Sequence, residues 1–155
     1  MRRLLIITTC CILLSAYSCG NGGKVDFSAA NTAKAYYDHL LNGRYEQFVD
    51  GMGFPERIPD TYREQLILNV KMFVEEQQNE HRGLSDVRVV NCVNDSTKKG
   101  AYAYLLLVFK DSVMEEVVVP MVNRDGIWYM SKEYIALYTT YIFLNKKAIN
   151  GKNSF

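Results

Sequence analysis

The hydrophobic pattern of this chain changes its period once, near Gly83, and this change constrains the fold more than any other feature. Before Gly83 the apolar residues recur every three or four positions, which predicts helices. After it the period is two, which predicts strands. The strands are joined by short turns, and Asn123-Arg124-Asp125-Gly126 is the strongest hairpin signal. Because short connections join antiparallel strands, the sequence predicts an α+β domain with N-terminal helices packed on a curved, four-stranded antiparallel meander.

Three helices are expected before Gly83. The first carries apolar residues from Ala33 to Leu41, is capped by Asn31 or Thr32, and ends at Asn42-Gly43. A short second helix is expected over residues 44–49. The third begins at a capping box formed by Thr61 and Glu64, and its apolar stripe is Leu66, Val70 and Phe73.

Strands are expected over residues 86–94, 101–110, 113–122 and 127–130. Both faces of the second strand are apolar, with Ala101, Leu105 and Phe109 on one face and Tyr102 and Leu106 on the other. A sheet with one wet face alternates apolar and polar residues, so both faces are expected to be covered. A C-terminal helix over residues 133–147 is expected to cover the second face, either on its own sheet or on a second copy.

The first residues form a secretion signal, MRRLLIITTCCILLSAYSC. Two arginines precede a short apolar run and a small-residue cleavage site, so residues 1–18 are expected to be a signal peptide. Cys19 follows the cleavage site, as in bacterial lipoproteins, although Ala16 stands where such signals usually have Leu. The sequence therefore predicts that Cys19 is lipidated and that residues 19–27 form a tether. The protein is expected in the cell envelope, anchored in the outer membrane of a Gram-negative bacterium. An ordinary cleaved signal that leaves Cys19 as a free thiol is the alternative.

Composition excludes several classes of function. The chain has 18 basic and 17 acidic residues, and loss of Arg2 and Arg3 leaves 16 basic against 17, a net charge of −1. This balance gives no footprint for nucleic acid. Cys92 is the one cysteine expected inside the fold, as an inert buried thiol. No spacing of His, Cys and carboxylates indicates a metal site, and no cofactor motif occurs.

The order of elements resembles the nuclear transport factor 2-like (NTF2-like) superfamily, and more closely its small bacterial lipoprotein domains of uncharacterised function. The likeness rests on the segments Ala33–Tyr45 and Asn123–Tyr129 and on the long helix between them, within residues 28–131. It implies that residues 28–155 form one cone-shaped domain with a pocket between helices and sheet. Some members of this superfamily are enzymes, including steroid isomerases, and others bind ligands or assemble with partners.

We expect a non-catalytic binding domain for a small apolar ligand or peptide. The residues expected to line its cleft are Tyr37, Tyr45, Leu66, Phe73, Phe109 and Trp128. The alternative is an envelope interaction module that uses the sheet face and the C-terminal helix to bind another envelope component or a second copy of itself. A steroid-isomerase-like enzyme is less favoured, because Asp38 and His39 lie between the apolar positions of the first helix and should face water.

Overall fold

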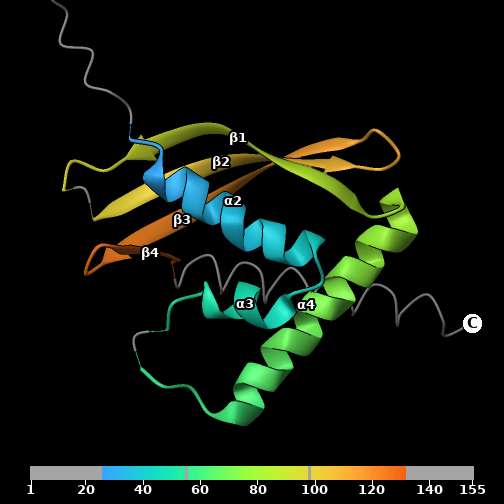
Figure 1. Ribbon diagram of the computed structural model, residues 1–155, viewed down its shortest axis with the longest axis horizontal. Helices are drawn as coiled ribbons and strands as arrows, with labels where there is room; N and C mark the ends of the chain where they lie inside the picture. The colour runs from blue at the N-terminus through green and yellow to red at the C-terminus, as the bar shows by residue number, and fades with distance from the viewer. Residues whose placement is uncertain (1–25, 55, 98, 132–155) are drawn as a thin grey trace, which may run out of the picture.

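Three helices precede four strands, in the predicted order (Figure 1). The structure is a computed structural model that describes residues 26–54, 56–97 and 99–131. The predicted signal peptide, Cys19, the tether up to residue 25 and the predicted C-terminal helix lie outside the described residues. The elements, labelled as in Figure 1, are α2 (Ser28–Leu41), α3 (Tyr45–Asp50), α4 (Asp60–His81), β1 (Leu84–Asn94), β2 (Gly100–Phe109), β3 (Met114–Arg124) and β4 (Ile127–Met130).

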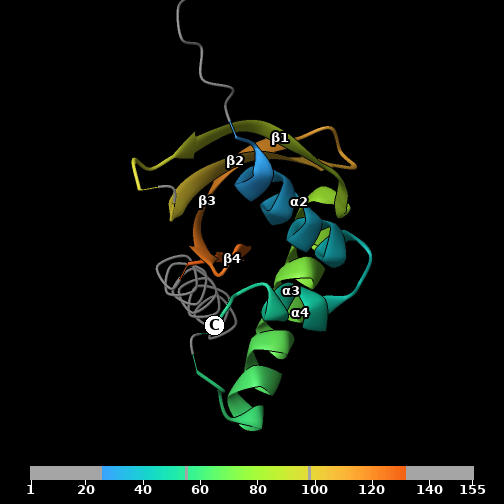
Figure 2. The same ribbon diagram turned by 60° about the vertical axis from the view of Figure 1, so that its left-hand side comes forward.

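The four strands form one antiparallel sheet in the order β1-β2-β3-β4, which confirms the predicted meander. The sheet is strongly curved, and α2 lies in its hollow (Figure 2). The register of β1 on β2 shifts between Leu84 and Asp86 and again between Val89 and Asn91. Extra residues of this kind bend a strand and increase its twist, which suits a sheet that wraps around a helix.

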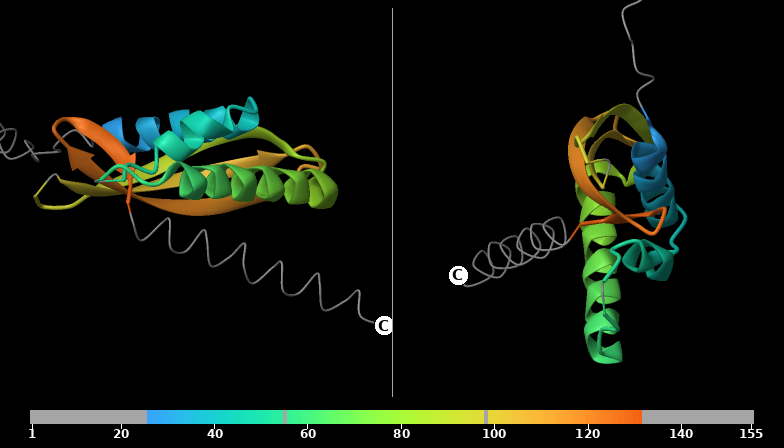
Figure 3. Two further views of the ribbon diagram at one scale, coloured as in Figure 1. Left: turned by 90° about the horizontal axis from the view of Figure 1, so that it is seen from below. Right: turned by 90° about the vertical axis from the view of Figure 1, so that its left-hand side faces the viewer.

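The core lies between the hollow of the sheet and α2. The inner residues of β2 are all buried, and the helix meets them with small side chains at Ala29, Ala30 and Ala33. Alanine at these positions lets the helix backbone approach the sheet closely. In contrast, α4 contacts the sheet near β1 and packs on α3, while its N-terminal half extends beyond the sheet (Figure 3).

The predicted capping residues of two helices are wrong. Helix α2 begins at Ser28, whose backbone N–H donates to Oδ1 of Asp26 at 2.9 Å, so Asn31 and Thr32 lie inside the helix rather than capping it. Helix α4 begins at Asp60, and no side chain caps it. Because Pro59 already provides the extended backbone that precedes this helix, Thr61 lies within the first turn and forms no capping box with Glu64.

The outer face of the sheet is apolar but open at several positions. Val93, Tyr102 and Val118 are 47%, 52% and 43% exposed. The described helices leave this face open at these three positions, because they all lie on the inner side. The C-terminal helix predicted to cover the outer face lies outside the described residues, so that cover stays a prediction. No helix within the described residues combines the length and apolar character needed to cross a membrane.

A short segment after α3 ties the helical layer to β4. The backbone N–H of Met130 donates to the carbonyl of Gly51 at 2.8 Å. The hydroxyl of Tyr36 on α2 donates to the carbonyl of Trp128 at 2.9 Å, and burial raises the pKa of this phenol. These bonds hold the end of the sheet against the helices.

Candidate ligand-binding site

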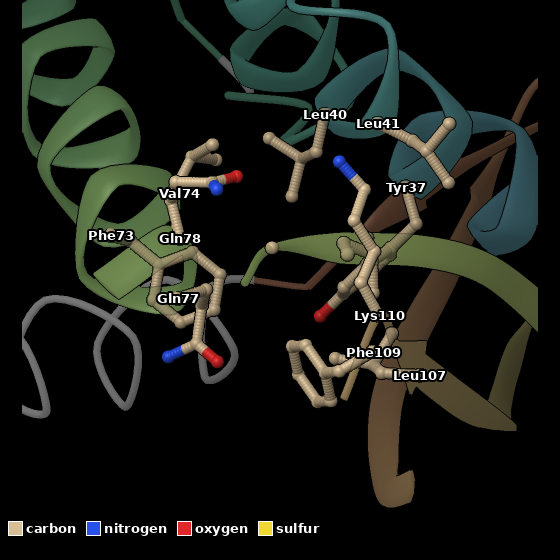
Figure 4. Close-up of a pocket in the computed structure, with 12 residues that line it drawn as sticks. Tyr37, Leu40, Leu41, Phe73, Val74, Gln77, Gln78, Leu107, Phe109 and Lys110 are labelled. Atoms are coloured by element: carbon tan, nitrogen blue, oxygen red, sulfur yellow. The ribbon is translucent and has the colours of Figure 1, made fainter. Parts of the chain in front are cut away.

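A cavity of about 130 Å³ lies between the C-terminal ends of α2 and α4 and the adjoining strands β1 and β2 (Figure 4). Apolar side chains from both helices and both strands form most of its wall. The lining residues are Tyr37, Leu40, Leu41, Phe73, Val74, Gln77, Gln78, Gly83, Leu84, Leu107, Phe109 and Lys110.

Helical and strand periodicity bring these residues together. On α4, Phe73 and Gln77 are four residues apart and share one face of the helix with their neighbours. Leu107 and Phe109 lie on the inner face of β2, where alternate residues point to the same side. In Figure 4 the α4 residues flank one side of the cavity, and the residues of α2 and β2 flank the other.

Gln77 is a buried polar residue in this apolar wall. It is 7% exposed, and it is the one polar residue in the buried part of the described chain. Its Oε1 atom is fully buried and has no hydrogen-bond partner among the residues that the structure describes. Because a buried polar atom without a partner is rare and costs about 1–3 kcal/mol, it needs an explanation, and a ligand with a donor would supply one.

The turn after α4 brings charge to the cavity's edge. The backbone N–H of Lys110 donates to the carbonyl of Gly83 at 3.0 Å, and the Lys110 side chain lines the cavity. Gly83 has a φ of +89°, and a Cβ there would lie 2.3 Å from Oε1 of Gln78. Glycine at 83 therefore permits both the backbone conformation and the close approach of Gln78.

A histidine–aspartate pair lies next to the cavity. Nδ1 of His81, in the last turn of α4, is 2.9 Å from Oδ2 of Asp111, in the turn between β2 and β3. The His81 ring also packs on Phe109, with 4.8 Å between ring centroids. The hydrogen bond with Asp111 raises the pKa of His81 and lowers the pKa of Asp111. The pair joins two elements that form the cavity wall.

Three of the six predicted cleft residues, Tyr37, Phe73 and Phe109, come together at this cavity. The ring of Tyr37 also meets Phe48 edge-on, with 5.6 Å between centroids. Sequence analysis did not single out Gln77 as a site residue. The signal that could have found it is the spacing, since residue 77 lies four positions after Phe73 and continues its stripe.

The other three predicted cleft residues lie away from the cavity wall. Leu66 is buried in the core at 2% exposure, and Trp128 is 8% exposed with its indole N–H donating to Oγ of Ser28 at 3.0 Å. Tyr45 is half-buried, and its ring lies 5.9 Å from the ammonium of Lys71. These three residues pack the domain rather than line the cavity.

The residues considered for acid–base chemistry are paired at the surface. Asp38 accepts a hydrogen bond from Lys34 at 2.6 Å, and Nδ1 of His39 accepts one from Nε of Arg44 at 3.0 Å. Neither residue lines the cavity. Cys92 is 3% exposed, and burial raises the pKa of its thiol, which disfavours the reactive thiolate.

Two wider hollows lie elsewhere on the surface. One of about 470 Å³ borders the ends of β2 and β3 near Tyr102 and Arg124, and one of about 270 Å³ borders the start of α4 near Arg63. Charged side chains form most of the lining of the second hollow, whereas the first has Asp95, Lys99 and Arg124 among mostly uncharged residues. Within the described residues, no group of three or more His, Cys, Asp or Glu side chains is arranged to hold a metal ion.

Comparison with known proteins identifies the fold. No protein-family model matches the chain, and no curated protein matches it. A solved structure of a protein described as an NTF2-like transpeptidase, from Campylobacter jejuni, superposes with a TM-score of 0.52 at 16% identity. The match covers 65% of this chain and 94% of that one. Helices packed on a four-stranded antiparallel sheet in this arrangement are the NTF2-like fold, and this chain has it.

Proposed function

We propose that this chain is a lipid-anchored protein of the cell envelope whose NTF2-like domain binds a small apolar ligand, or an apolar side chain of a peptide, without catalysing a reaction. The observation that carries the proposal is the cavity of about 130 Å³ between α2, α4 and β2, with its mostly apolar wall. Pockets of this kind, with a few polar groups set in an apolar wall, are typical of small-molecule sites.

The size of the cavity sets the size of the group that it holds. A cavity of roughly 150 Å³ lined by Leu, Ile and Phe is known to bind benzene, so the cavity here suits one ring or a short branched chain. Burying about 150 Å² of apolar surface contributes roughly 4 kcal/mol, which corresponds to a Kd of about 1 mM. Tighter binding needs the polar groups of the wall as well.

The chemistry of the wall supports binding rather than catalysis. Among the described residues, its polar side chains are Tyr37, Gln77, Gln78 and Lys110, and none of its described side chains carries a carboxylate, imidazole, hydroxymethyl or thiol group. The Campylobacter protein is described as a transpeptidase, an activity that requires a group able to carry an acyl intermediate. Cys92, the cysteine among the described residues, is buried outside the cavity wall.

The anchor is a separate part of the proposal, and it rests on the signal sequence and Cys19. Lipid chains add about 0.8 kcal/mol per buried CH₂, so two or more chains hold a protein stably on a membrane. Cys19→Ala should move the protein from the membrane to the soluble fraction and abolish labelling by an alkyne-bearing fatty acid. Cys11→Ala, inside the signal, is the matched control and should change neither. Labelling that persists in Cys19→Ala would contradict the anchor.

An interaction module is the second candidate, and one observation favours it. The outer face of the sheet exposes apolar side chains at Val90, Val93, Tyr102 and Val118. Such a face suits a partner surface or a second copy. A dimer that is lost on deletion of residues 133–155 would favour self-association through this face and the predicted C-terminal helix.

Native mass spectrometry of the full chain, purified from membranes in detergent, tests the binding proposal. The expected result is an acylated chain that carries the extra mass of one small co-purified molecule. The matched pair is Val74→Phe, which fills the cavity from its wall, and Val90→Phe, which adds the same ring at an exposed position. Only the first should lose the extra mass. Retention of the mass in Val74→Phe would place the ligand elsewhere.

A further inference from the structure

The cavity wall carries two polar groups that a purely apolar ligand would leave unmatched. Oε1 of Gln77 is buried without a hydrogen-bond partner in the described part of the chain. The side chain of Lys110 lines the same cavity, and no ion pair among the described residues includes it. Together they indicate a ligand that carries polar groups in addition to its apolar body.

The unpaired side-chain oxygen of Gln77 favours a ligand with a hydrogen-bond donor. A carboxamide oxygen only accepts, and the side chains that share the wall with it are mostly apolar. Forming the missing hydrogen bond with a ligand O–H or N–H would remove the cost of the unpaired atom, whereas an apolar group against it would leave that cost in place. Gln77 therefore favours ligands with a donor on the part that is buried.

The positive charge of Lys110 favours a ligand with an anionic group. Its ammonium is a flexible point charge on a residue exposed at the cavity's edge, where it can meet a ligand group that remains hydrated. The next residue, Asp111, is the nearest carboxylate in the sequence, and it pairs with His81 instead. The positive charge at this edge is therefore available to a ligand carboxylate.

We propose that the ligand is a small carboxylic acid with a ring-sized apolar body and one hydroxyl or N–H donor. The body fills the cavity, and the carboxylate meets the ammonium of Lys110. The donor meets Oε1 of Gln77 after a rotation of the buried carboxamide turns this oxygen toward the cavity. This inference rests on the proposed function, because it assigns a ligand class to the same cavity. It goes further in requiring two polar contacts that ligand binding by itself does not require.

Four para-substituted benzenes test the two contacts separately. They combine a hydroxyl or a methyl at one end with a carboxylate or a methyl at the other: 4-hydroxybenzoate, 4-methylbenzoate, p-cresol and p-xylene. Each is titrated into the full chain in detergent, and binding is followed by NMR. Partitioning into micelles is the same for every variant, so ratios of apparent Kd compared between variants cancel it.

In the wild type, 4-hydroxybenzoate should bind about 3- to 10-fold more tightly than 4-methylbenzoate, the usual range for one hydrogen bond. Gln77→Leu should abolish this preference, while Gln65→Leu, on the same helix but outside the cavity wall, should keep it. Similarly, 4-hydroxybenzoate should bind about 2- to 5-fold more tightly than p-cresol, with a preference that falls as salt is added. Lys110→Met should remove that preference, and Lys99→Met, outside the wall, should not.

When the free concentration of each compound is corrected for its uptake by protein-free micelles, the wild-type ratios by themselves decide the inference, so it does not depend on how the variants fold. Saturable p-xylene binding with no preference for hydroxyl or carboxylate would overturn the ligand class and leave the proposed function standing. That result would also mean that water, rather than a ligand, satisfies Gln77. Failure of all four compounds to saturate would overturn the ligand class and the cavity's proposed function together.

Discussion

Nδ1 of His81 and Oδ2 of Asp111 lie 2.9 Å apart and join the last turn of α4 to the turn between β2 and β3. His81 and Asp111 are thirty positions apart in the sequence, and the bond connects the two elements that flank the cavity at this end. Because the His81 ring also packs on Phe109, the pair holds part of the cavity wall in place.

The pair makes stability depend on pH in a defined direction. Asp111 raises the pKa of His81, so this contribution is present below the unfolded pKa of about 6.5 and is lost as pH rises through the folded value. His81 lowers the pKa of Asp111, so that contribution is present above about pH 4 and is lost as pH falls. The pair therefore stabilises the fold most between these limits.

NMR titration of the imidazole protons checks this prediction. His81 should titrate above its usual value, and Asp111→Asn should return it toward about 6.5. Asp125→Asn, in the next hairpin turn, is the control and should leave His81 unchanged. An unshifted His81 in the wild type would contradict the pairing.

Gly51→Ala should destabilise the protein by about 1–3 kcal/mol, the range for overpacking a well-filled interior. Gly51 has an ordinary φ of −65°, so backbone strain is not the cause. Instead, a Cβ at this position would lie 2.4 Å from the ring of Tyr36, whose hydroxyl is held by the carbonyl of Trp128.

Urea unfolding of Gly51→Ala measures this effect, with Gly100→Ala as the control. A Cβ at Gly100 would meet first the carboxylate end of Asp95 at 2.8 Å, an exposed group that can move away. Gly100→Ala should therefore cost less than Gly51→Ala. Equal stability of Gly51→Ala and wild type would show that Tyr36 yields easily.

Gln77→Met should stabilise the ligand-free protein by about 1 kcal/mol. Methionine keeps the length of the side chain and removes the buried, unpaired Oε1, whose cost is about 1–3 kcal/mol. Binding sites commonly keep residues that lower the free energy of unfolding of the ligand-free protein. Urea unfolding of both proteins without ligand is the measurement, and a loss of stability in Gln77→Met would show that water or another group already satisfies the carboxamide.

The order of elements could be predicted because each helix and strand buries one regular face. The residues from Ala101 to Phe109 alternate cleanly between buried and open positions, and the hairpin at Asp125-Gly126 forms where predicted. The helix starts could not be read in the same way. Several residues near each start can cap a helix, and the choice at Ser28 depends on where Asp26 lies in space.

The candidate site could be predicted in part. Phe73 and Phe109 line the cavity, whereas Leu66, which has the same apolar character in the sequence, lies in the core. Apolar character predicts burial without distinguishing a cavity wall from a filled interior. Gln77 was missed because glutamine is usually exposed, and its burial depends on the tertiary packing of α4 against β1.

Titration of p-xylene into the full chain with ¹³C-labelled leucine and valine methyl groups tests the central claim, that the cavity is a binding site. We predict saturable shifts at Leu40, Leu84 and Leu107, with a Kd of about 1 mM, that are lost in Val74→Phe and kept in Val90→Phe. Shifts confined to methyl groups of the open sheet face, such as those of Val93 and Val118, or no saturable shift at all, would contradict the account.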